Sequence, residues 1–343
     1  MSKDRDLERI QPPPDPVAWD DFVRSQAGWT AFHLTSWQRV IERTFGHRVH
    51  ALEARRDGEI VGVLPLATVK SRLFGHYLIS MPFVSYGGPL GDAPAVEALI
   101  AHARSLADDL SVDLLQLRAR KPLPTAMDVS THKVTVLLEL PESPEALWDG
   151  LKAKVRSQVR RPRKEGFEVR FGDDQVAGFW KVFAHHMRDL GTPVMPHAFF
   201  EILAEELGDT ATFGCVYDGE IPIAGGCTIE WGTETEITWA SSLRSYNRQA
   251  PNMLLYWSFM ERAIERGQRA FNFGRCTPDG GTHHFKRQWG GRDEPLYWYR
   301  HGGGRAGTPS PDDGKYAMGV RLWQRIPLPI ANVLGPRIVK YIP

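Results

Sequence analysis

The stretches "RRDGEIVGVLPLATV" (residues 55–69) and "VYDGEIPIAGGCTIE" (residues 216–230) carry the same four residues, Asp-Gly-Glu-Ile, between two apolar segments. An Asp-Gly turn between such segments predicts a β-hairpin in each half of the chain. Asp57 and Asp218, which open the two copies, lie almost half a chain apart. A repeat of this length indicates two similar domains rather than the short units of a solenoid.

Similar elements surround both hairpins. A helix is predicted before each one, the first with Thr35 as N-cap and ending at Gly46, the second ending at Gly208. After each hairpin the pattern predicts another strand, a long amphipathic helix and a final apolar strand. In the first half the helix covers residues 93–109 and the final strand 112–120. In the second half the helix covers residues 251–266 and the final strand 269–275. This order predicts an α/β fold (α+β mixed sheet) with helices on the faces of each sheet.

The expected joint between the two halves lies in "LPESPEALWDG", where Ser143 caps a helix that Pro144 begins. We therefore expect an N-terminal domain over residues 1–142 and a C-terminal domain with a basic entry helix over 143–300. Residues 301–343 are expected to form a Gly/Pro/Ser linker followed by an apolar and basic tail.

Composition narrows the class of protein. The chain has 343 residues, 42% apolar and 24% charged, and a net charge of +1, so it has no global attraction to polyanions. Its three cysteines cannot all pair and show no zinc-ribbon spacing. The N-terminus has no signal-like apolar region, and the longest apolar run is too short to cross a bilayer. These features predict a cytoplasmic protein.

A dense group of cations lies on the helix expected after Ser143. Seven lysines and arginines fall between Lys152 and Lys164 without a carboxylate, and Arg156 and Arg160 share one helical stripe with Lys152. Such a group either binds an anion, for which a phosphate-bearing ligand is the natural candidate, or is a solvated basic face. The residues leave both interpretations open.

The segment "FGRCTPDGGTHHFKRQWGG" (residues 273–291) places Lys286 between Phe285 and Trp289, just after a glycine-rich loop, with Arg275 at the end of the preceding strand. A desolvated ammonium there could stabilise an oxyanion or a phosphate, or it could be a lysine extending from an ordinary aromatic cluster. His283 and His284 are adjacent and lack a third ligand, so no metal site is expected.

Five blocks occur in order along the chain: "FHLTSWQRVIERTFGH" (32–47), "FVSYGGPL" (83–90), "LGTPVMPHAFF" (190–200), "FNFGR" (271–275) and "HHFKRQWGG" (283–291). Together they resemble the FemAB-like proteins, most closely the group encoded with exosortase (PEP-CTERM) systems. The end of the chain, "LWQRIPLPIANVLGP" (residues 322–336), resembles the tail of that group as well.

The resemblance implies two tandem domains of the GNAT acyltransferase fold and no tightly bound cofactor. Fem-type enzymes transfer an amino acid from aminoacyl-tRNA to an amine of a cell-wall precursor, and GNAT relatives use acyl-CoA. The F-K-x-x-[FW]-G motif of the family falls on Phe285, Lys286, Trp289 and Gly290. Lys286 is thus implied to be catalytic, with Arg275 in support.

Further residues are implied to bind substrate by the same resemblance. An aromatic-Gly-Pro block that lines the Fem acceptor groove matches Tyr86 and Gly88, and a segment before the long helix matches Trp239 and Ser242. Two departures stand out: there is no room for the coiled-coil insertion of many tRNA-using Fem enzymes, and the arginine that holds the precursor's diphosphate has no clear match.

Together these features predict an N-acyltransferase or aminoacyltransferase that acts on an amine of a phosphate-bearing cell-envelope or exopolysaccharide precursor, with acyl-CoA or aminoacyl-tRNA as donor. The rival hypothesis is a non-catalytic module that binds a nucleotide- or lipid-linked sugar. The tail carries no acidic residue after Gly314. It is expected to dock on the body of the protein, and the alternative is peripheral contact with an anionic membrane surface.

Overall fold

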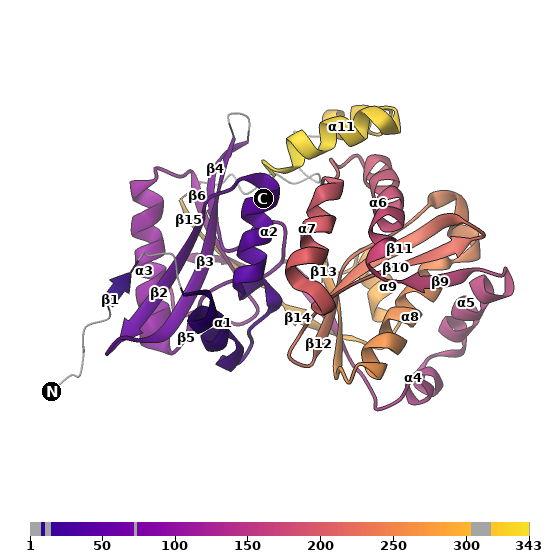
Figure 1. Ribbon diagram of the computed structural model, residues 1–343, viewed down its shortest axis with the longest axis horizontal. Coiled ribbons are helices and arrows are strands. Elements are labelled where there is room, and N and C mark those ends of the chain that lie inside the picture. The colour runs from indigo at the N-terminus through magenta and orange to yellow at the C-terminus, as the bar shows by residue number, and fades with distance from the viewer. Residues whose placement is uncertain (1–7, 11–14, 72–73, 303–316, 343) are drawn as a thin grey trace. The chain divides into compact units, whose positions relative to one another are not determined.

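The computed structural model describes residues 8–10, 15–71, 74–302 and 317–342. Their contacts divide the chain into two units, each built on one sheet (Figure 1). Unit 1 comprises the described residues within 1–133, 295–309 and 340–343, and unit 2 those within 134–294 and 310–339. The expected linker between residues 303 and 316 lies outside the described residues.

The sheet of unit 1 has the strand order β1-β2-β3-β4-β6-β15-β7, with β5 beside β3. Only β4 and β6 are parallel neighbours; the other described pairs are antiparallel. The strands are β1 (Glu8–Ile10), β2 (Val49–Arg56), β3 (Glu59–Ser71), β4 (Gly75–Ile79), β5 (Leu90–Gly91), β6 (Leu114–Ala119), β7 (Asp128–Ser130) and β15 (Tyr297–Gly302).

Helices cover both faces of this sheet (Figure 1). The long helix α3 (Ala93–Asp109) packs on one face, where Leu64 and Leu66 of β3 are buried. Helix α1 (Pro16–Ser25) packs on the opposite face, where Val63 lies against Trp19. Alternate residues of β3 therefore belong to two different apolar layers, as a strand buried on both faces requires. A short 3₁₀ turn, Ala31–His33, leads into α2 (Thr35–Phe45).

The sheet of unit 2 repeats the same plan, with the order β14-β8-β13-β12-β11-β10-β9. Its parallel pair is β12 with β13, which corresponds to β4 with β6 in unit 1. The strands are β8 (Val134–Glu139), β9 (Glu168–Phe171), β10 (Ala211–Asp218), β11 (Ile221–Trp231), β12 (Glu234–Ser242), β13 (Ala270–Cys276) and β14 (Arg292–Pro295).

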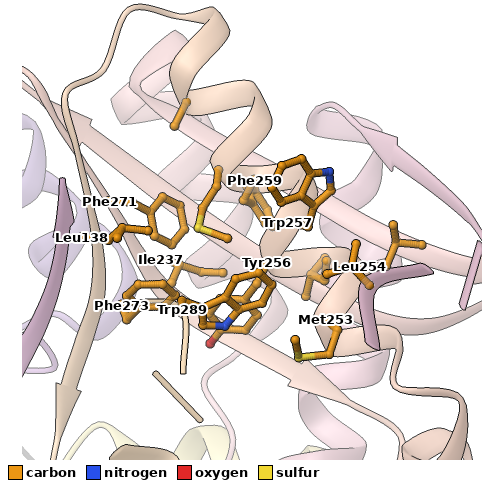
Figure 2. Packing of buried hydrophobic residues seen from close by; sticks show 14 of the residues in the cluster. Leu138, Ile237, Met253, Leu254, Tyr256, Trp257, Phe259, Phe271, Phe273 and Trp289 are labelled. Atoms are coloured by element: carbon orange, nitrogen blue, oxygen red, sulfur yellow. The ribbon is translucent and has the colours of Figure 1, made fainter. Parts of the chain in front are cut away.

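Two pairs of helices enclose this second sheet. On one face α8 packs with α5 over an apolar cluster that includes Ile237, Phe271 and Phe273 (Figure 2). On the other face α6 and α7 bring Phe179 and Phe200 against Phe213. The helices are α4 (Pro144–Gly150), α5 (Ala153–Lys164), α6 (Val176–Leu190), α7 (His197–Leu207), α8 (Pro251–Glu265), α9 (Gly281–Arg287), α10 (Ala317–Trp323) and α11 (Leu328–Val339).

Each sheet takes one strand from the other half of the sequence. Strand β8, whose residues fall within the expected N-terminal domain, pairs with β13 in unit 2, and β15 pairs with β6 in unit 1. The division by contacts thus falls between residues 133 and 134 and again between 294 and 295, rather than at 142 and 300. Composition and caps could not indicate this, because strand membership is decided by pairing between residues far apart in sequence.

Several local expectations hold, and two differ in detail. Both hairpins form, and Asp57 and Gly58 have the positive φ angles of 53° and 82° that a tight two-residue turn needs. Ser143 caps α4 as expected, but the basic segment is a separate helix because the chain is extended at Leu151 and Lys152.

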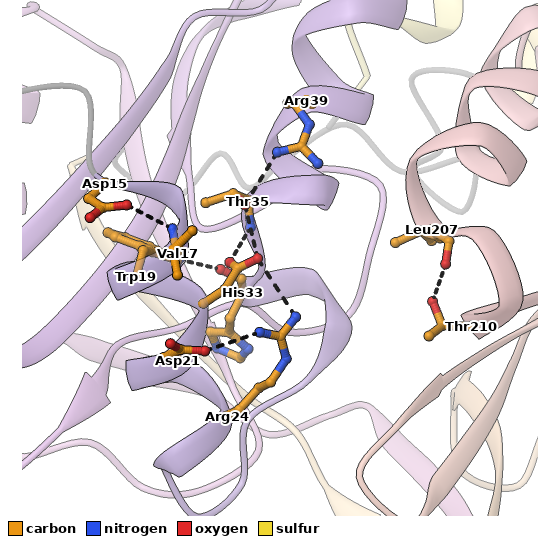
Figure 3. A network of polar contacts seen from close by, with 11 residues as sticks. Asp15, Val17, Trp19, Asp21, Arg24, His33, Thr35, Arg39, Leu207 and Thr210 are labelled. Atoms are coloured by element: carbon orange, nitrogen blue, oxygen red, sulfur yellow. Dashed lines mark hydrogen bonds and ion pairs between the residues drawn. The ribbon is translucent and has the colours of Figure 1, made fainter.

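Helix α2 begins one residue earlier than the sequence indicated, with Leu34 as its N-cap. Thr35 lies inside the helix (Figure 3). The side chain of Asp20 on α1 performs the capping. Its carboxylate accepts hydrogen bonds from the Thr35 amide at 2.9 Å and the Thr35 hydroxyl at 3.0 Å. A capping group from another helix cannot be recognised from the local sequence.

We expect Asp20→Ala to lower the free energy of unfolding by about 1 kcal/mol, the usual value of a helix-capping side chain. Asp21→Ala is the matched control, since Asp21 is exposed and its ion pair with Arg24 spans 3.7 Å. Urea unfolding followed by circular dichroism measures both. Equal stability of the two variants would contradict the capping role.

Candidate functional site

Strands β12 and β13 are paired only at their beginnings. The parallel ladder joins Glu234–Glu236 to Ala270–Asn272, although β12 continues to Ser242 and β13 to Cys276. Both strands also have a register shift close to this point, β12 against β11 and β13 against β8. The two neighbours therefore diverge just after Glu236 and Asn272. The carboxyl end of a parallel pair is a common position for a binding site in sheets of this kind.

Gly274 occupies the point of divergence. Its φ of +70° favours glycine, and a Cβ there would lie 3.9 Å from Glu236 Oε1, 3.9 Å from Lys286 Nζ and 3.4 Å from the Ile237 carbonyl oxygen. Glu236 from β12 and Lys286 from α9 thus approach the same small volume. Two ionisable side chains from distant segments therefore both approach Gly274, where the strands separate.

The Lys286 side chain is held by backbone carbonyls. It is only 5% exposed, and Nζ donates hydrogen bonds to the carbonyl oxygens of Gly274 at 2.7 Å and Arg275 at 3.0 Å. An ammonium group has three N–H donors, of which these contacts use two. Burial lowers the pKa of Lys286 to about 8, although the nearby Cys276 and Glu236 act in the opposite direction.

Glu236 is the second buried ionisable group at this point, and it is 2% exposed. Its Oε1 accepts a hydrogen bond from the Thr238 hydroxyl at 3.4 Å. Burial raises the pKa of Glu236 to about 8, against the opposing effects of Lys286, Thr238 and Arg275. The pKa of the carboxyl group is raised and the pKa of the ammonium group is lowered, so the two groups have similar proton affinities. A group whose pKa lies close to the working pH is suited to accept or donate a proton during a reaction.

Asn272 fixes the strands beneath this pair. It is completely buried, its Nδ2 donates to Glu234 Oε1 at 2.7 Å, and its Oδ1 accepts from the Gly274 amide at 2.8 Å and from the Thr135 hydroxyl. These bonds connect β8, β12 and β13. Sequence reasoning missed both Asn272 and Glu236, though a polar residue inside "FNFG" and a carboxylate inside "EITW" are each unusual in buried strands.

The aromatic neighbours of Lys286 pack into the apolar cluster. Trp289 is buried there (Figure 2). Phe285 meets Tyr256 edge-on with ring centroids 4.9 Å apart. They anchor the helix α9 and exclude water from beneath it, while the ammonium itself is bonded to carbonyl oxygens. The geometry thus agrees with the expected desolvated ammonium. The described partners of the Lys286 ammonium are backbone carbonyl oxygens rather than the faces of aromatic rings.

Other residues expected from the sequence lie on the same two strands. Arg275 is exposed at the end of β13, one residue beyond Gly274. Trp239 is half-buried against Phe199 and Phe200 on the diverging part of β12, and Ser242 is that strand's buried last residue. The structure therefore groups Lys286 with Arg275 and places Trp239 and Ser242 on the half of β12 that pairs with β11 but not with β13.

The two arginines of the basic helix make contacts of another kind. Arg156 donates to the Trp148 and Asp149 carbonyl oxygens at 3.5 and 3.3 Å, at the end of α4, and Arg160 lies over the Trp148 ring at 5.0 Å. Neither contact involves Lys286 or Glu236. The structure shows these arginines joining α4 to α5, with the Arg160 side chain exposed.

Tyr86 and Gly88 belong to unit 1 and are tightly packed there. Tyr86 is 1% exposed and has Arg120 over its ring, while a Cβ on Gly88 would lie 2.8 Å from the Arg118 carbonyl oxygen. The Gly88 carbonyl also accepts a hydrogen bond from His33 Nε2 at 3.0 Å. The structure thus gives these two residues a packing role in the segment after β4.

In unit 1, the segment after β4 occupies the position that corresponds to the divergence of β12 and β13 in unit 2. Beyond Ile79 the chain stays bonded to β6, through Ser80 to the Gln116 carbonyl and through Gly87 to the Arg118 carbonyl. The Arg118 guanidinium donates to the Val84 carbonyl at 2.7 Å. Unit 1 therefore closes this end of its parallel pair with its own chain, and unit 2 places Glu236 and Lys286 there.

No cluster of metal ligands occurs among the residues that the structure describes. His283 has structural partners instead: Nε2 lies 3.0 Å from both Asp293 carboxylate oxygens, and Nδ1 accepts from the Asp279 amide. In the described ranges, no helix has the length and apolar character needed to span a membrane.

Comparisons with known proteins agree with this architecture. Residues 151–287 match the family model described as "Acetyltransferase (GNAT) domain". Similar solved structures include FemX (16% identity, TM-score 0.66, covering 85% of this chain and 97% of FemX), L-PGS from Bacillus licheniformis (14%, 0.56, 92% and 99%) and a tandem GNAT protein from the clavulanic acid biosynthesis pathway (14%, 0.56, 88% and 100%). No curated protein matches the sequence significantly.

The fold is therefore two mixed α/β sheets in a tandem GNAT arrangement, as the resemblance implied. The matched segment contains β12, β13 and all of α9, so Glu236 and Lys286 both lie within the GNAT domain. The match assigns a GNAT acetyltransferase domain to residues 151–287, and an acyltransferase activity with it.

Proposed function

We propose that this GNAT-type acyltransferase is an N-acyltransferase or aminoacyltransferase whose reaction centre is the Lys286–Glu236 pair in unit 2. The observation that carries the proposal is that these two buried groups both approach Gly274, at the divergence of β12 and β13. Amide formation from an activated ester needs a proton acceptor for the amine and a donor for the developing oxyanion. The pair supplies one of each.

The reaction can be followed atom by atom. The amine nitrogen of the acceptor attacks the carbonyl carbon of a thioester or ester, and a new C–N bond forms. The Glu236 carboxylate accepts the proton that the amine loses, and the remaining N–H of Lys286 donates to the carbonyl oxygen as it becomes an oxyanion. Breaking the C–S or C–O bond then expels the leaving group, which takes up the proton from Glu236. No covalent enzyme intermediate is needed.

The donor is proposed to be acyl-CoA or aminoacyl-tRNA. Beyond Glu236, the side of β12 that faces β13 has no ladder partner there, and it offers backbone groups to an extended ligand that contains amides, as the arm of acyl-CoA does. Trp239 and Ser242 lie on that part of β12, and the exposed Arg275 stands beside the carbonyls that hold Lys286. These residues would contact the donor close to its reactive carbonyl.

The acceptor is proposed to be an amine of a phosphate-bearing cell-envelope or exopolysaccharide precursor, used in the cytoplasm. Support comes from the resemblance to FemAB-like proteins encoded with exosortase systems and from the structural likeness to FemX. Tyr86 and Gly88 would shape the acceptor side of unit 1 from within, since they are packed beneath its surface. Arg156 and Arg160 are the proposed phosphate contacts.

The test is a turnover assay with mass detection. Wild type and Lys286→Met are incubated with acyl-CoAs or aminoacyl-tRNAs and with amine acceptors that include nucleotide sugars, and each ligand is also tested by thermal shift. At 100 times its dissociation constant, a bound donor should stabilise the fold by roughly 2.7 kcal/mol. One donor class consumed with formation of an amide supports the proposal. Nucleotide-sugar binding without consumption of any donor would favour the rival binding module.

We expect Arg156→Gln/Arg160→Gln to weaken binding of the phosphate-bearing substrate by roughly ten- to a hundredfold, the value of one or two charge-assisted hydrogen bonds. The matched control is Arg163→Gln/Lys164→Gln, which removes the same charge from the same helix. Isothermal titration calorimetry measures the affinities. Equal effects of the two variants would remove this stripe from the site and leave a solvated basic face.

A further inference from the structure

Exposed apolar side chains are concentrated at the end of the described chain. The structure exposes nine large hydrophobic residues in the described ranges. Five of them lie on the two tail helices, α10 and α11: Met318, Leu322, Ile330, Val333 and Leu334. Met318 and Leu322 are 83% and 65% exposed. A concentration of this kind usually marks a binding surface.

The exposed polar side chains among them are mainly cations. Arg321 and Arg325 accompany Met318 and Leu322 at helical spacing, and Arg337 follows Val333 and Leu334. Residues 317–342 contain no aspartate or glutamate. We call these eight residues the tail surface: Met318, Arg321, Leu322, Arg325, Ile330, Val333, Leu334 and Arg337.

The opposite face of the tail is fixed to unit 2. Ala331, Gly335 and Val339 are buried at a spacing of four, and a Cβ on Gly335 would lie 2.9 Å from the Val194 amide nitrogen. Val320 packs on Gly191 in the same way. The tail therefore docks as expected from the sequence, through one face of α11. The tail surface stays exposed on the opposite side of helices that are packed against unit 2.

We propose that the tail surface lies on a membrane of anionic lipids. Apolar side chains interleaved with arginines match the boundary between acyl chains and negatively charged headgroups. There the burial of apolar area and the attraction of arginines to anionic headgroups both favour binding. A second copy of the chain would bring arginines against arginines, so it is a poor occupant. This inference is independent of the proposed chemistry. It assigns the protein a peripheral position at a membrane, where lipid-linked substrates are found.

Vesicle flotation of the full-length protein tests the proposal, using phosphatidylcholine vesicles with and without 30% phosphatidylglycerol (roughly physiological anionic content). Wild type should float with the anionic vesicles and stay behind with the neutral ones. Arg321→Gln/Arg325→Gln should lower the partition coefficient roughly 30-fold, and Met318→Ser/Leu322→Ser roughly tenfold or more. The control Val129→Ser/Ile221→Ser, which alters exposed hydrophobics on strands β7 and β11, should bind as wild type does.

Three results would overturn the proposal. Wild type could remain unbound to anionic vesicles, or the two tail variants could float as well as the control. A concentration-dependent dimer in light scattering that Met318→Ser/Leu322→Ser abolishes would instead assign the tail surface to a second copy. Thermal unfolding of each variant verifies that the tail substitutions leave the fold intact, because all four altered tail residues are exposed.

Discussion

Replacing Lys286 by methionine should lower kcat for acyl transfer by roughly 10²- to 10³-fold, the usual consequence of removing one donor to a developing oxyanion. Methionine keeps most of the volume of this buried side chain and cannot donate a hydrogen bond. The carbonyl oxygens of Gly274 and Arg275 would lose the ammonium group that now bonds them. Single-turnover kinetics on the folded fraction measures the chemical step directly.

A purely structural lysine would behave differently. It would lower the free energy of unfolding while leaving kcat of the folded enzyme within about threefold of wild type, and that result would contradict the catalytic role. Donor binding gives a second readout, since an oxyanion contact acts in the transition state and leaves ground-state affinity little changed. Arg287→Met is the matched control, because Arg287 lies on the same helix with its side chain exposed.

Replacing Glu236 by glutamine should remove the rising limb of the pH–rate profile and lower kcat/KM by roughly 10²- to 10⁴-fold, the range of general base catalysis. In wild type, activity rises as the carboxyl group loses its proton, and burial places that pKa at about 8. Activity falls again as Lys286 loses its proton, with a pKa lowered to about 8. The profile should be a narrow bell, whose two limbs belong to the coupled pair.

Glutamine keeps the shape of the side chain and its bond to the Thr238 hydroxyl but cannot accept the amine's proton. Glu261→Gln is the control. Burial also raises the pKa of Glu261, but that residue lies on α8 beside Arg163. If Glu236→Gln keeps the rising limb, or if both variants lose it alike, another group is the base. Initial rates between pH 6 and 10 (roughly two units either side of the pair) decide between these cases.

Much of the fold could be predicted from short stretches of sequence. The Asp-Gly turns, the Gly46 stop, the Ser143 cap and the two long helices each depend on residues within a few positions of one another. The predictions failed where a distant group replaced the local signal. Asp20 supplies the cap of α2 from another helix.

For the same reason, the sequence indicated only part of the candidate site. The motif around Lys286 is local, and the apolar residues beside it indicated a desolvated ammonium. Its partners are not local: the carbonyls of Gly274 and Arg275 come from β13, and Glu236 comes from β12. Tyr86 shows the converse, since the family resemblance implied that it lines a groove, while the structure packs it beside Phe32.

The sequence by itself determined the duplication, the turns, the helices and the lysine motif, because hydrophobic period, caps and turn residues act over a few positions. Only the tertiary structure decided that β8 joins the second sheet and β15 the first, and that Glu236 and Lys286 both approach Gly274. Strand pairing and burial join residues separated by tens to hundreds of positions. A shift of one residue in register turns every side chain to the opposite face of the sheet, so the register that brings β12 and α9 to Gly274 also creates the ionisable pair.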